Sequence, residues 1–260
     1  MQTSPMPMDR LTLSAIAHRT HRFCSPLSQA LVDDVLDAVS LPLHGRVLDL
    51  GCGNAELLRH VITRLGATGE GVDRSERMLE EAARRAEHTA ERARLTLHQG
   101  DTSDFAERAV ASATTWELVM MVGAGLGEGE GPEAALRTLC RLTRPGGYVL
   151  FGEPYWREPP THAYLEALGT GADAFRDHAG NVAAGEAAGL VPFSARVAGE
   201  AEWDEYEWRY ARELERWCLE NPGHPEVPAV RERSRSWRNV SLTMGRRFLG
   251  FGLYLFHKAE

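Results

Sequence analysis

The sequence predicts an α/β fold with a doubly wound, mostly parallel sheet, because strand-like and helix-like segments alternate along much of its length. The strand-like segments are short and largely apolar, as is typical of parallel strands that helices cover on both faces. Asp49, Asp73, Asp101, Gly123 and Glu153 all fall where such a segment ends. Since open parallel sheets bind ligands at the carboxyl ends of their strands, these residues are expected to share one ligand-binding edge.

The expected helices and strands follow one another without long gaps. The first helix is expected in SPLSQALVDDVLDAV, with Ser25 as its cap and Pro26 at its first position. A strand at Arg46–Leu50 comes next, and further strands are expected in GEGVD, LTLHQGD, WELVMMVGAG and YVLFGEPYW. Helices are expected to begin after Ser75 and at Pro132, the second of them ending at RPGG. The helix after Ser75 is expected to point these residues inward: Met78, Leu79, Ala82, Ala83 and Ala86.

The two ends of the chain are less regular. The residues before the first helix are expected to be frayed. Towards the C-terminus, a helix is expected at 182–188, a strand at 193–197, and two longer helices at 202–219 and 227–244. The stretch FGLYLFHK alternates between aromatic and other apolar residues and is expected to form the last strand.

Composition limits the classes of function. The 260 residues, with 43% hydrophobic content, suit one large domain. A formal net charge of -8 argues against a broad nucleic-acid surface, and no apolar stretch is long enough for a membrane helix. The opening MQTSPMPMDR lacks the apolar core of a signal peptide, so a cytoplasmic protein is expected. Four scattered cysteines indicate neither a disulfide framework nor a metal site.

The stretch VLDLGCGNAE carries a glycine turn that is typical of nucleotide-binding folds. An apolar strand ends there in an acid and then in Gly51 and Gly53, which let the backbone approach a ligand closely. Asp73 follows at about the spacing at which a carboxylate accepts from ribose hydroxyls. The third glycine of the dinucleotide fingerprint is replaced by Glu56. This replacement argues against a nicotinamide-dependent oxidoreductase, although the turn alone leaves that alternative open.

Four segments in order, VLDLGCG, GVDRSERML, HQGDTSDF and RPGGYVLFGEPYW, resemble the class I S-adenosylmethionine-dependent methyltransferases over residues 45–156. The resemblance implies S-adenosyl-L-methionine as cofactor and a sheet of seven strands whose last strand is antiparallel. It also explains Glu56, because this cofactor has no pyrophosphate for a third glycine to accommodate. The chain is then expected to form a single domain with an N-terminal cap at 1–40, a helical lid at 200–245 and a final strand at 248–258.

The resemblance also implies which residues hold the cofactor. The Gly51 to Gly53 backbone would lie along its methionine part, with Asp49 oriented toward its amino group. Asp73 would hold the ribose, and Asp101 would read the adenine. The implied cofactor-binding residues are Asp49, Gly51, Cys52, Gly53, Asn54, Asp73, Arg74, Met78, Asp101, Thr102, Val122 and Gly123.

The acceptor is expected to be a small molecule that is methylated on nitrogen or oxygen, with carbon as the weaker alternative. The segment GAGLGEGEG lacks the Asn-Pro-Pro-Tyr type motif of amide and adenine methylators, which argues against those substrates. Methyl transfer is an in-line displacement, so a base is needed only where the acceptor carries a proton. The candidates for that base are Glu153, Tyr155 and His18. Each also has a structural explanation: an ion pair for Glu153, the core for Tyr155, and a capping or solvated position for His18.

The helices near the C-terminus permit two interpretations. The arginines of AVRERSRSWRN fit a solvated helix face better than a surface for nucleic acid. The aromatic residues around them, including Trp203 and Tyr206, mostly indicate helix packing. A protein that binds the cofactor without catalysing transfer remains an alternative function. A monomer or homodimer is expected, with neither a nucleic-acid nor a membrane partner.

Overall fold

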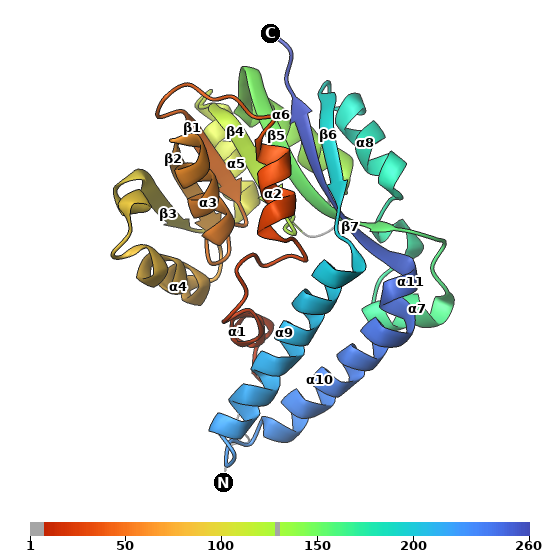
Figure 1. Cartoon of the computed structure of the whole chain (residues 1–260). Coiled ribbons are helices and arrows are strands. Elements are labelled where there is room, and N and C mark those ends of the chain that lie inside the picture. The colour runs from red at the N-terminus through yellow and green to blue at the C-terminus, as the bar shows by residue number, and fades with distance from the viewer. Residues whose placement is uncertain (1–7, 128–130) are drawn as a thin grey trace.

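A seven-stranded sheet forms the centre of the molecule, in a computed structural model that describes residues 8–127 and 131–260 (Figure 1). The strand order is β3-β2-β1-β4-β5-β7-β6. Strand β7 pairs antiparallel with β5 and β6, whereas β1 to β5 pair in parallel. The strands are β1 Arg46–Leu50, β2 Thr68–Asp73, β3 Leu95–Gln99, β4 Trp116–Val122, β5 Thr143–Trp156, β6 Val191–Val197 and β7 Leu249–His257. This arrangement confirms the predicted fold class.

Helices cover both faces of the sheet, as expected for a doubly wound fold. One core cluster joins α2, α3 and α4 to the face that carries Val47, and a second joins α5, α6 and α8 to the face that carries Leu48. Side chains of a strand point alternately to its two faces, so β1 supplies both clusters. These helices are α2 Gln29–Leu36, α3 Glu56–Leu65, α4 Glu76–Ala86, α5 Thr102–Ala111, α6 Pro132–Leu142 and α8 His178–Ala187.

The remaining helices gather beyond one end of the sheet. Helix α9 (Glu200–Glu220) and helix α10 (Val227–Val240) project away from it, with α1 (Arg10–Ala17) beside α9 (Figure 1). A separate apolar cluster joins α1 to this pair, with Leu13 and Ala17 packed against Leu214 and Val230. From residue 8 onward, the structure therefore contradicts the expectation of frayed residues ahead of the first predicted helix, while residues 1–7 lie outside the described part of the chain. Burial of the apolar side of α1 explains the difference, because a short helix gains most of its stability from packing.

Several predicted boundaries are wrong for identifiable reasons. Helix α2 is capped by Ser28 and not by Ser25, since the Ser28 hydroxyl oxygen accepts a hydrogen bond from the Leu31 backbone nitrogen at 3.2 Å. In α4, Ala83 is exposed although it was expected to point inward. Strand β5 begins at Thr143, so it includes the segment that was expected to end the preceding helix.

The C-terminal half also contains elements that the sequence did not predict. Helix α10 ends at Val240, and a single π-helical turn over Ser241–Gly245 leads into the short α11 (Arg246–Phe248). Helix α7 (His162–Leu168) lies between β5 and α8. Among the residues that the structure describes, no helix combines the length and apolar character needed to cross a membrane.

Helix α8 and strand β7 approach each other unusually closely, which gives a test of the packing. A Cβ atom at Gly185 would lie only 2.1 Å from Cε1 of Phe256. Helix propensity alone would make alanine about 1 kcal/mol better than glycine there. We expect the steric term to prevail, so that Gly185→Ala lowers the free energy of unfolding by about 1 to 3 kcal/mol in urea denaturation.

The neighbouring Glu186 offers a matched control, because it lies in the same helix and is exposed. Glu186→Ala is expected to change the free energy of unfolding by no more than about 0.5 kcal/mol. A Gly185→Ala protein more stable than the wild type would show that α8 is free to move away from β7, contrary to the packing described.

Candidate functional site

A cavity of about 700 Å³ opens at the carboxyl ends of β1, β2, β3 and β4. It lies where the strand order reverses between β1 and β4, which is the usual ligand position in open α/β sheets. Helices α1 and α9 contribute the opposite wall. The lining residues are Arg10, Leu11, Ser14, His18, Cys24, Gly51, Gly53, Asp73, Arg74, Ser75, Met78, Gly100, Asp101, Thr102, Val122, Gly123, Ala124, Gly125, Gly127 and Tyr206.

Most of the residues predicted to form the site meet around this cavity, although they come from separate elements of the fold. The predicted residues that line it are Gly51, Gly53, Asp73, Arg74, Met78, Asp101, Thr102, Val122, Gly123 and His18. Those outside its lining are Asp49, Cys52, Asn54, Glu153 and Tyr155. The carboxyl ends of the strands are therefore brought together as expected, whereas the residues from the end of β5 are not.

The glycine turn after β1 is held by backbone hydrogen bonds. The backbone nitrogens of Gly51 and Cys52 both donate to the Val72 carbonyl oxygen, at 2.8 and 3.0 Å. Gly51 has a φ of 81°, and a Cβ atom there would lie 2.3 Å from Cβ of Ala124. Only glycine fits this position without displacing the start of the neighbouring loop. The Cys52 side chain points into the core, so this residue offers a ligand its backbone alone.

Asp73 fixes the shape of the turn from the end of β2. One of its carboxylate oxygens accepts from the Gly53 backbone nitrogen at 2.8 Å, and the other accepts from the Ser75 backbone nitrogen at the same distance. The side chain is only partly buried and faces the cavity. Each carboxylate oxygen can accept more than one hydrogen bond, so Asp73 retains the capacity to accept from a ligand.

Asp49 is a buried acid directly beneath the glycine turn. It is 3% exposed, and no described residue donates a hydrogen bond to its carboxyl group. Burial, reinforced by the neighbouring Asp73 carboxylate, raises the pKa of Asp49 to about 7. A positive charge placed beside Asp49 would favour its ionised form. The site is therefore suited to a cationic group.

Asp101 caps α5 and also faces the cavity. One of its carboxylate oxygens accepts from both the backbone nitrogen and the hydroxyl of Ser103, at 2.8 and 2.6 Å. These hydrogen bonds lower the pKa of Asp101, so its carboxyl group is ionised at neutral pH. The other oxygen is not engaged by this cap. The adjacent Thr102 hydroxyl donates to the Gly125 carbonyl oxygen at 2.8 Å and ties α5 to the loop after β4.

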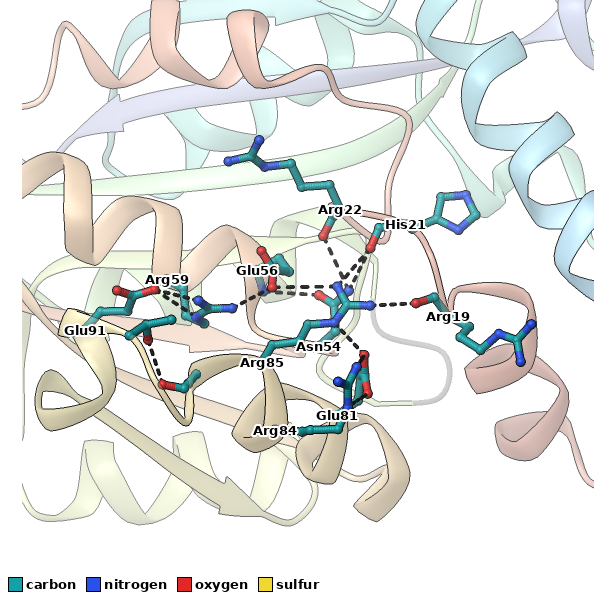
Figure 2. Close-up of polar contacts among 12 residues, drawn as sticks. Arg19, His21, Arg22, Asn54, Glu56, Arg59, Glu81, Arg84, Arg85 and Glu91 are labelled. Atoms are coloured by element: carbon teal, nitrogen blue, oxygen red, sulfur yellow. Dashed lines mark hydrogen bonds and ion pairs between the residues drawn. The ribbon is translucent and has the colours of Figure 1, made fainter.

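An N-terminal strap, defined here as residues 19–22, crosses from α1 towards the sheet and is held by side chains from α4 and the glycine turn (Figure 2). The Arg85 guanidinium donates to the carbonyl oxygens of Arg19 and His21, at 2.6 and 3.1 Å. The Asn54 amide also donates to the His21 carbonyl oxygen, at 3.2 Å. Asn54 thus holds the strap and does not line the cavity. No local sequence pattern indicates this role of Arg85, since its partners lie 64 and 66 residues away in the sequence.

The wall formed by α1 and α9 brings His18 and Tyr206 into the cavity. His18 follows the last residue of α1, and Tyr206 lies in the second turn of α9. The sequence predicts a role in helix packing for Tyr206, whereas the structure places it at the cavity wall. The sequence feature that could have pointed to Tyr206 is the helical spacing of Trp203, Tyr206 and Tyr210. This spacing places three aromatic side chains along one side of α9.

Glu153 and Tyr155 lie within the sheet, since β5 continues to Trp156 and pairs with β7 from Tyr148 to that end. The Glu153 carboxyl group forms no hydrogen bond or ion pair with another described residue, and burial raises its pKa to about 8. Tyr155 is 9% exposed, and its ring lies tilted against that of His178 of α8, with the ring centroids 5.4 Å apart. The predicted ion pair of Glu153 with an arginine is not found among the described residues.

A family model and a related protein both match the sequence of this chain. A family model described as a methyltransferase domain matches residues 47–147. The chain is 28% identical over 249 residues to the uncharacterized protein YjhP of Escherichia coli strain K12, covering 95% of this chain and 98% of that protein.

Two solved structures resemble the chain over nearly its whole length. A SAM-dependent methyltransferase from Geobacter sulfurreducens, in complex with S-adenosyl-L-homocysteine, has a TM-score of 0.85 and 28% identity over 96% of this chain and 98% of that one. A SAM-dependent methyltransferase from Thiobacillus denitrificans, in complex with the same molecule, has a TM-score of 0.82 and 27% identity over 96% and 99%.

These likenesses cover 96% of this chain, so they include the added helices as well as the sheet. They favour methyl transfer over the nicotinamide-dependent alternative. The chain belongs to the class I S-adenosylmethionine-dependent methyltransferases.

Proposed function

We propose that this methyltransferase transfers the methyl group to a nitrogen or oxygen atom of a small molecule. The observation that carries the proposal is the convergence of Gly51, Asp73, Asp101 and Gly123 on one cavity that α1 and α9 wall off. A cavity of about 700 Å³ is of the size that holds a cofactor with a small ligand. The acidic net charge of -8 also favours a small molecule over nucleic acid as the acceptor.

The residues present fit S-adenosyl-L-methionine, which is the cofactor of this family. Asp49 is a buried carboxyl group without a described hydrogen-bond donor, and the cofactor carries an ammonium group that would satisfy it. The turn at Gly51 leaves no room for a side chain, so its backbone can lie against the ligand. Asp73 would accept from the ribose hydroxyls. Asp101 would accept from the adenine amine, and the backbone at Thr102 would also contact the adenine.

The chain's contribution to the reaction is chiefly positioning and exclusion of water. The cofactor supplies a methyl group on a sulfonium, so the acceptor needs a lone pair aligned with the methyl carbon and little else. The chain near Val122 and Gly123 would line the path between cofactor and acceptor. Helix α1, the N-terminal strap and α9 would keep water away from that path.

The roles of Glu153 and Tyr155 as proton acceptors stay predictions. Both side chains lie outside the cavity lining. With a pKa of about 8, Glu153 is mostly protonated at neutral pH and is a poor base there. His18 is better placed, since it lines the cavity and burial lowers its pKa, which keeps it neutral.

We further propose that the chain acts as one methyltransferase domain. Residues 1–40 would form a cap and residues 200–245 a lid over a cofactor-binding core at 45–156, with 248–258 as the final strand. The monomeric or homodimeric state and the cytoplasmic location stay predictions from the sequence.

The first test of the site is calorimetric titration with S-adenosyl-L-methionine, S-adenosyl-L-homocysteine and NAD. Asp73→Ala is expected to weaken binding of the first two by about 10- to 100-fold, because hydrogen bonds to a charged group contribute about 1.5 to 3 kcal/mol. The exposed Asp104 in the same region is a matched control, and Asp104→Ala should leave affinity unchanged. Equal affinity in the Asp73→Ala protein would contradict the role of Asp73. Tight cofactor binding without methyl transfer to any acceptor would favour the non-catalytic alternative.

A second test uses the raised pKa of Asp49. Binding of an ammonium group requires the Asp49 carboxylate, so affinity for S-adenosyl-L-homocysteine should fall as the pH drops below about 7. The limiting decrease is about tenfold per pH unit, which calorimetry between pH 6 and pH 8 can measure. Asp49→Asn should bind more weakly at pH 8 and lose this dependence. A pH dependence that persists unchanged in Asp49→Asn would assign the effect to another group.

A further inference from the structure

The hydrogen bonds of His18 determine which of its ring nitrogens carries the proton. Its Nδ1 atom lies 2.8 Å from the Ser14 carbonyl oxygen. A carbonyl oxygen can only accept, so Nδ1 must be the donor and must carry hydrogen. In the neutral ring, Nε2 is then a bare acceptor. The neutral ring is favoured because burial lowers the pKa of His18 from its ordinary value.

The hydrogen-bond partner of Nε2 is the hydroxyl group of Tyr206, a residue of α9. The Tyr206 hydroxyl oxygen lies 3.0 Å from Nε2 of His18. Since Nε2 carries no hydrogen, the Tyr206 hydroxyl donates to it. The phenol oxygen keeps its lone pairs and can still accept a hydrogen bond. Burial raises the pKa of Tyr206 well above its usual range, so the group donates as a neutral phenol and not as a phenolate.

The pair is placed close to the expected path of the methyl group. Both His18 and Tyr206 line the cavity, together with Cys24. The Cys24 sulfur lies 3.5 Å from the position of a Cβ atom at Gly53, and the Cys24 carbonyl oxygen lies 3.9 Å from that at Gly123. Cys24 therefore lies close to both the glycine turn and the end of β4. This places the wall that carries the pair over the point where cofactor and acceptor would meet.

Helix docking alone does not account for the pair. Leu13 and Ala17 of α1 already pack against Leu214 of α9 in an apolar cluster. A buried histidine and phenol add little to such a contact, because both lose their hydrogen bonds with water when they are buried. Two polar groups at the cavity wall, with their donor and acceptor roles fixed by Ser14, are better explained by a role toward a ligand.

We propose that Tyr206 is a catalytic residue that takes a proton from the methyl acceptor while passing its own hydroxyl proton to Nε2 of His18. This inference rests on the proposed methyl transfer. The acceptor atom forms a bond to the methyl carbon, and the bond from that carbon to sulfur breaks. The N–H or O–H bond of the acceptor breaks, its proton goes to the Tyr206 oxygen, and the Tyr206 proton goes to His18. The positive charge of the sulfonium ends on the imidazolium.

The relay restricts the class of acceptor. It serves a neutral amine, alcohol or phenol, whose attacking atom loses a proton during the transfer. An acceptor that is already anionic, such as a thiolate, has no proton to transfer and would gain nothing from it. The substrate class that this cavity favours is therefore a small molecule with a neutral N–H or O–H nucleophile.

The first arm of the test examines the pair without turnover. Nitrogen-15 NMR of the histidines, recorded on the full chain with S-adenosyl-L-homocysteine, should show His18 as the neutral ring protonated on Nδ1 at pH 7.5. Tyr206→Phe should shift the Nε2 resonance of His18, because the phenol hydrogen bond is lost. A ring protonated on Nε2, or an imidazolium at that pH, would overturn the relay.

The second arm measures release of S-adenosyl-L-homocysteine with ethanolamine, glycine, phenol, catechol, thiophenol and a low-molecular-mass cell extract as acceptors. Tyr206→Phe should lower the rate on amine and phenol acceptors by about 100-fold or more, with cofactor affinity unchanged. Tyr210→Phe is the matched control, because Tyr210 lies one helical turn away with its ring centroid 5.5 Å from His18. The rate on thiophenol at alkaline pH should depend little on Tyr206.

The pH profile separates a proton acceptor from a structural contact. The wild-type rate should fall as the pH drops through the pKa of His18, which lies below 6.5, and His18→Gln should lose this dependence. The other titratable groups that face His18 are His21, Tyr206 and Tyr210. Burial lowers the pKa of His21 to about 4, so the loss of the pH dependence in His18→Gln is the result that assigns the effect to His18.

The outcomes distinguish the relay from the function on which it rests. Equal rates for the wild type and Tyr206→Phe, with amine or phenol acceptors, would overturn the relay and leave methyl transfer intact. Cofactor binding with no release by the wild type on any acceptor would overturn both. A Tyr206→Phe protein that loses cofactor affinity along with rate would assign Tyr206 a structural role.

Discussion

The ligand edge depends on the parallel pairing of β1 with β2 on one side and β4 on the other. The chain must leave β1 and β4 in opposite directions along the sheet, and this reversal leaves a gap that none of the described helices fills. The glycine turn covers the start of the gap, because the Val72 carbonyl oxygen receives hydrogen bonds from both Gly51 and Cys52. Without that anchor to β2, neither the glycine turn nor the start of α3 would have a fixed position relative to Asp73.

The same pairing brings two acids together at one place. Asp49 is buried beneath the turn, and the Asp73 carboxylate beside it adds to the burial in raising the pKa of Asp49 to about 7. Desolvation of a carboxyl group opposes its ionisation unless a positive charge compensates. The site is electrostatically incomplete without a cation, which explains why a methyltransferase keeps an acid where a packed apolar side chain would serve the fold equally well.

The separation in sequence between contacting residues decides which parts of the site could be predicted. Gly51, Asp73 and Asp101 were predictable, because strand ends and tight turns are determined by neighbouring residues. The interaction of His18 with Tyr206 joins residues 188 positions apart, and no local pattern encodes it. Tyr155 shows the same limit: the motif placed it at a strand end, whereas its pairing with β7, about 95 residues further along the chain, draws this part of β5 into the sheet.

The strand ends and the wall of α1 and α9, which together form the site, are therefore under different structural constraints. Strand ends hold the acids and the glycine turn, and their geometry cannot change without disturbing the parallel pairing. The wall of α1 and α9 is joined to the sheet through exposed or partly buried contacts such as that of Arg85 with the N-terminal strap. Substitutions in that wall can alter the acceptor chemistry while the cofactor contacts stay intact. A family that shares one sheet can in this way serve many acceptors, since specificity resides in the added helices.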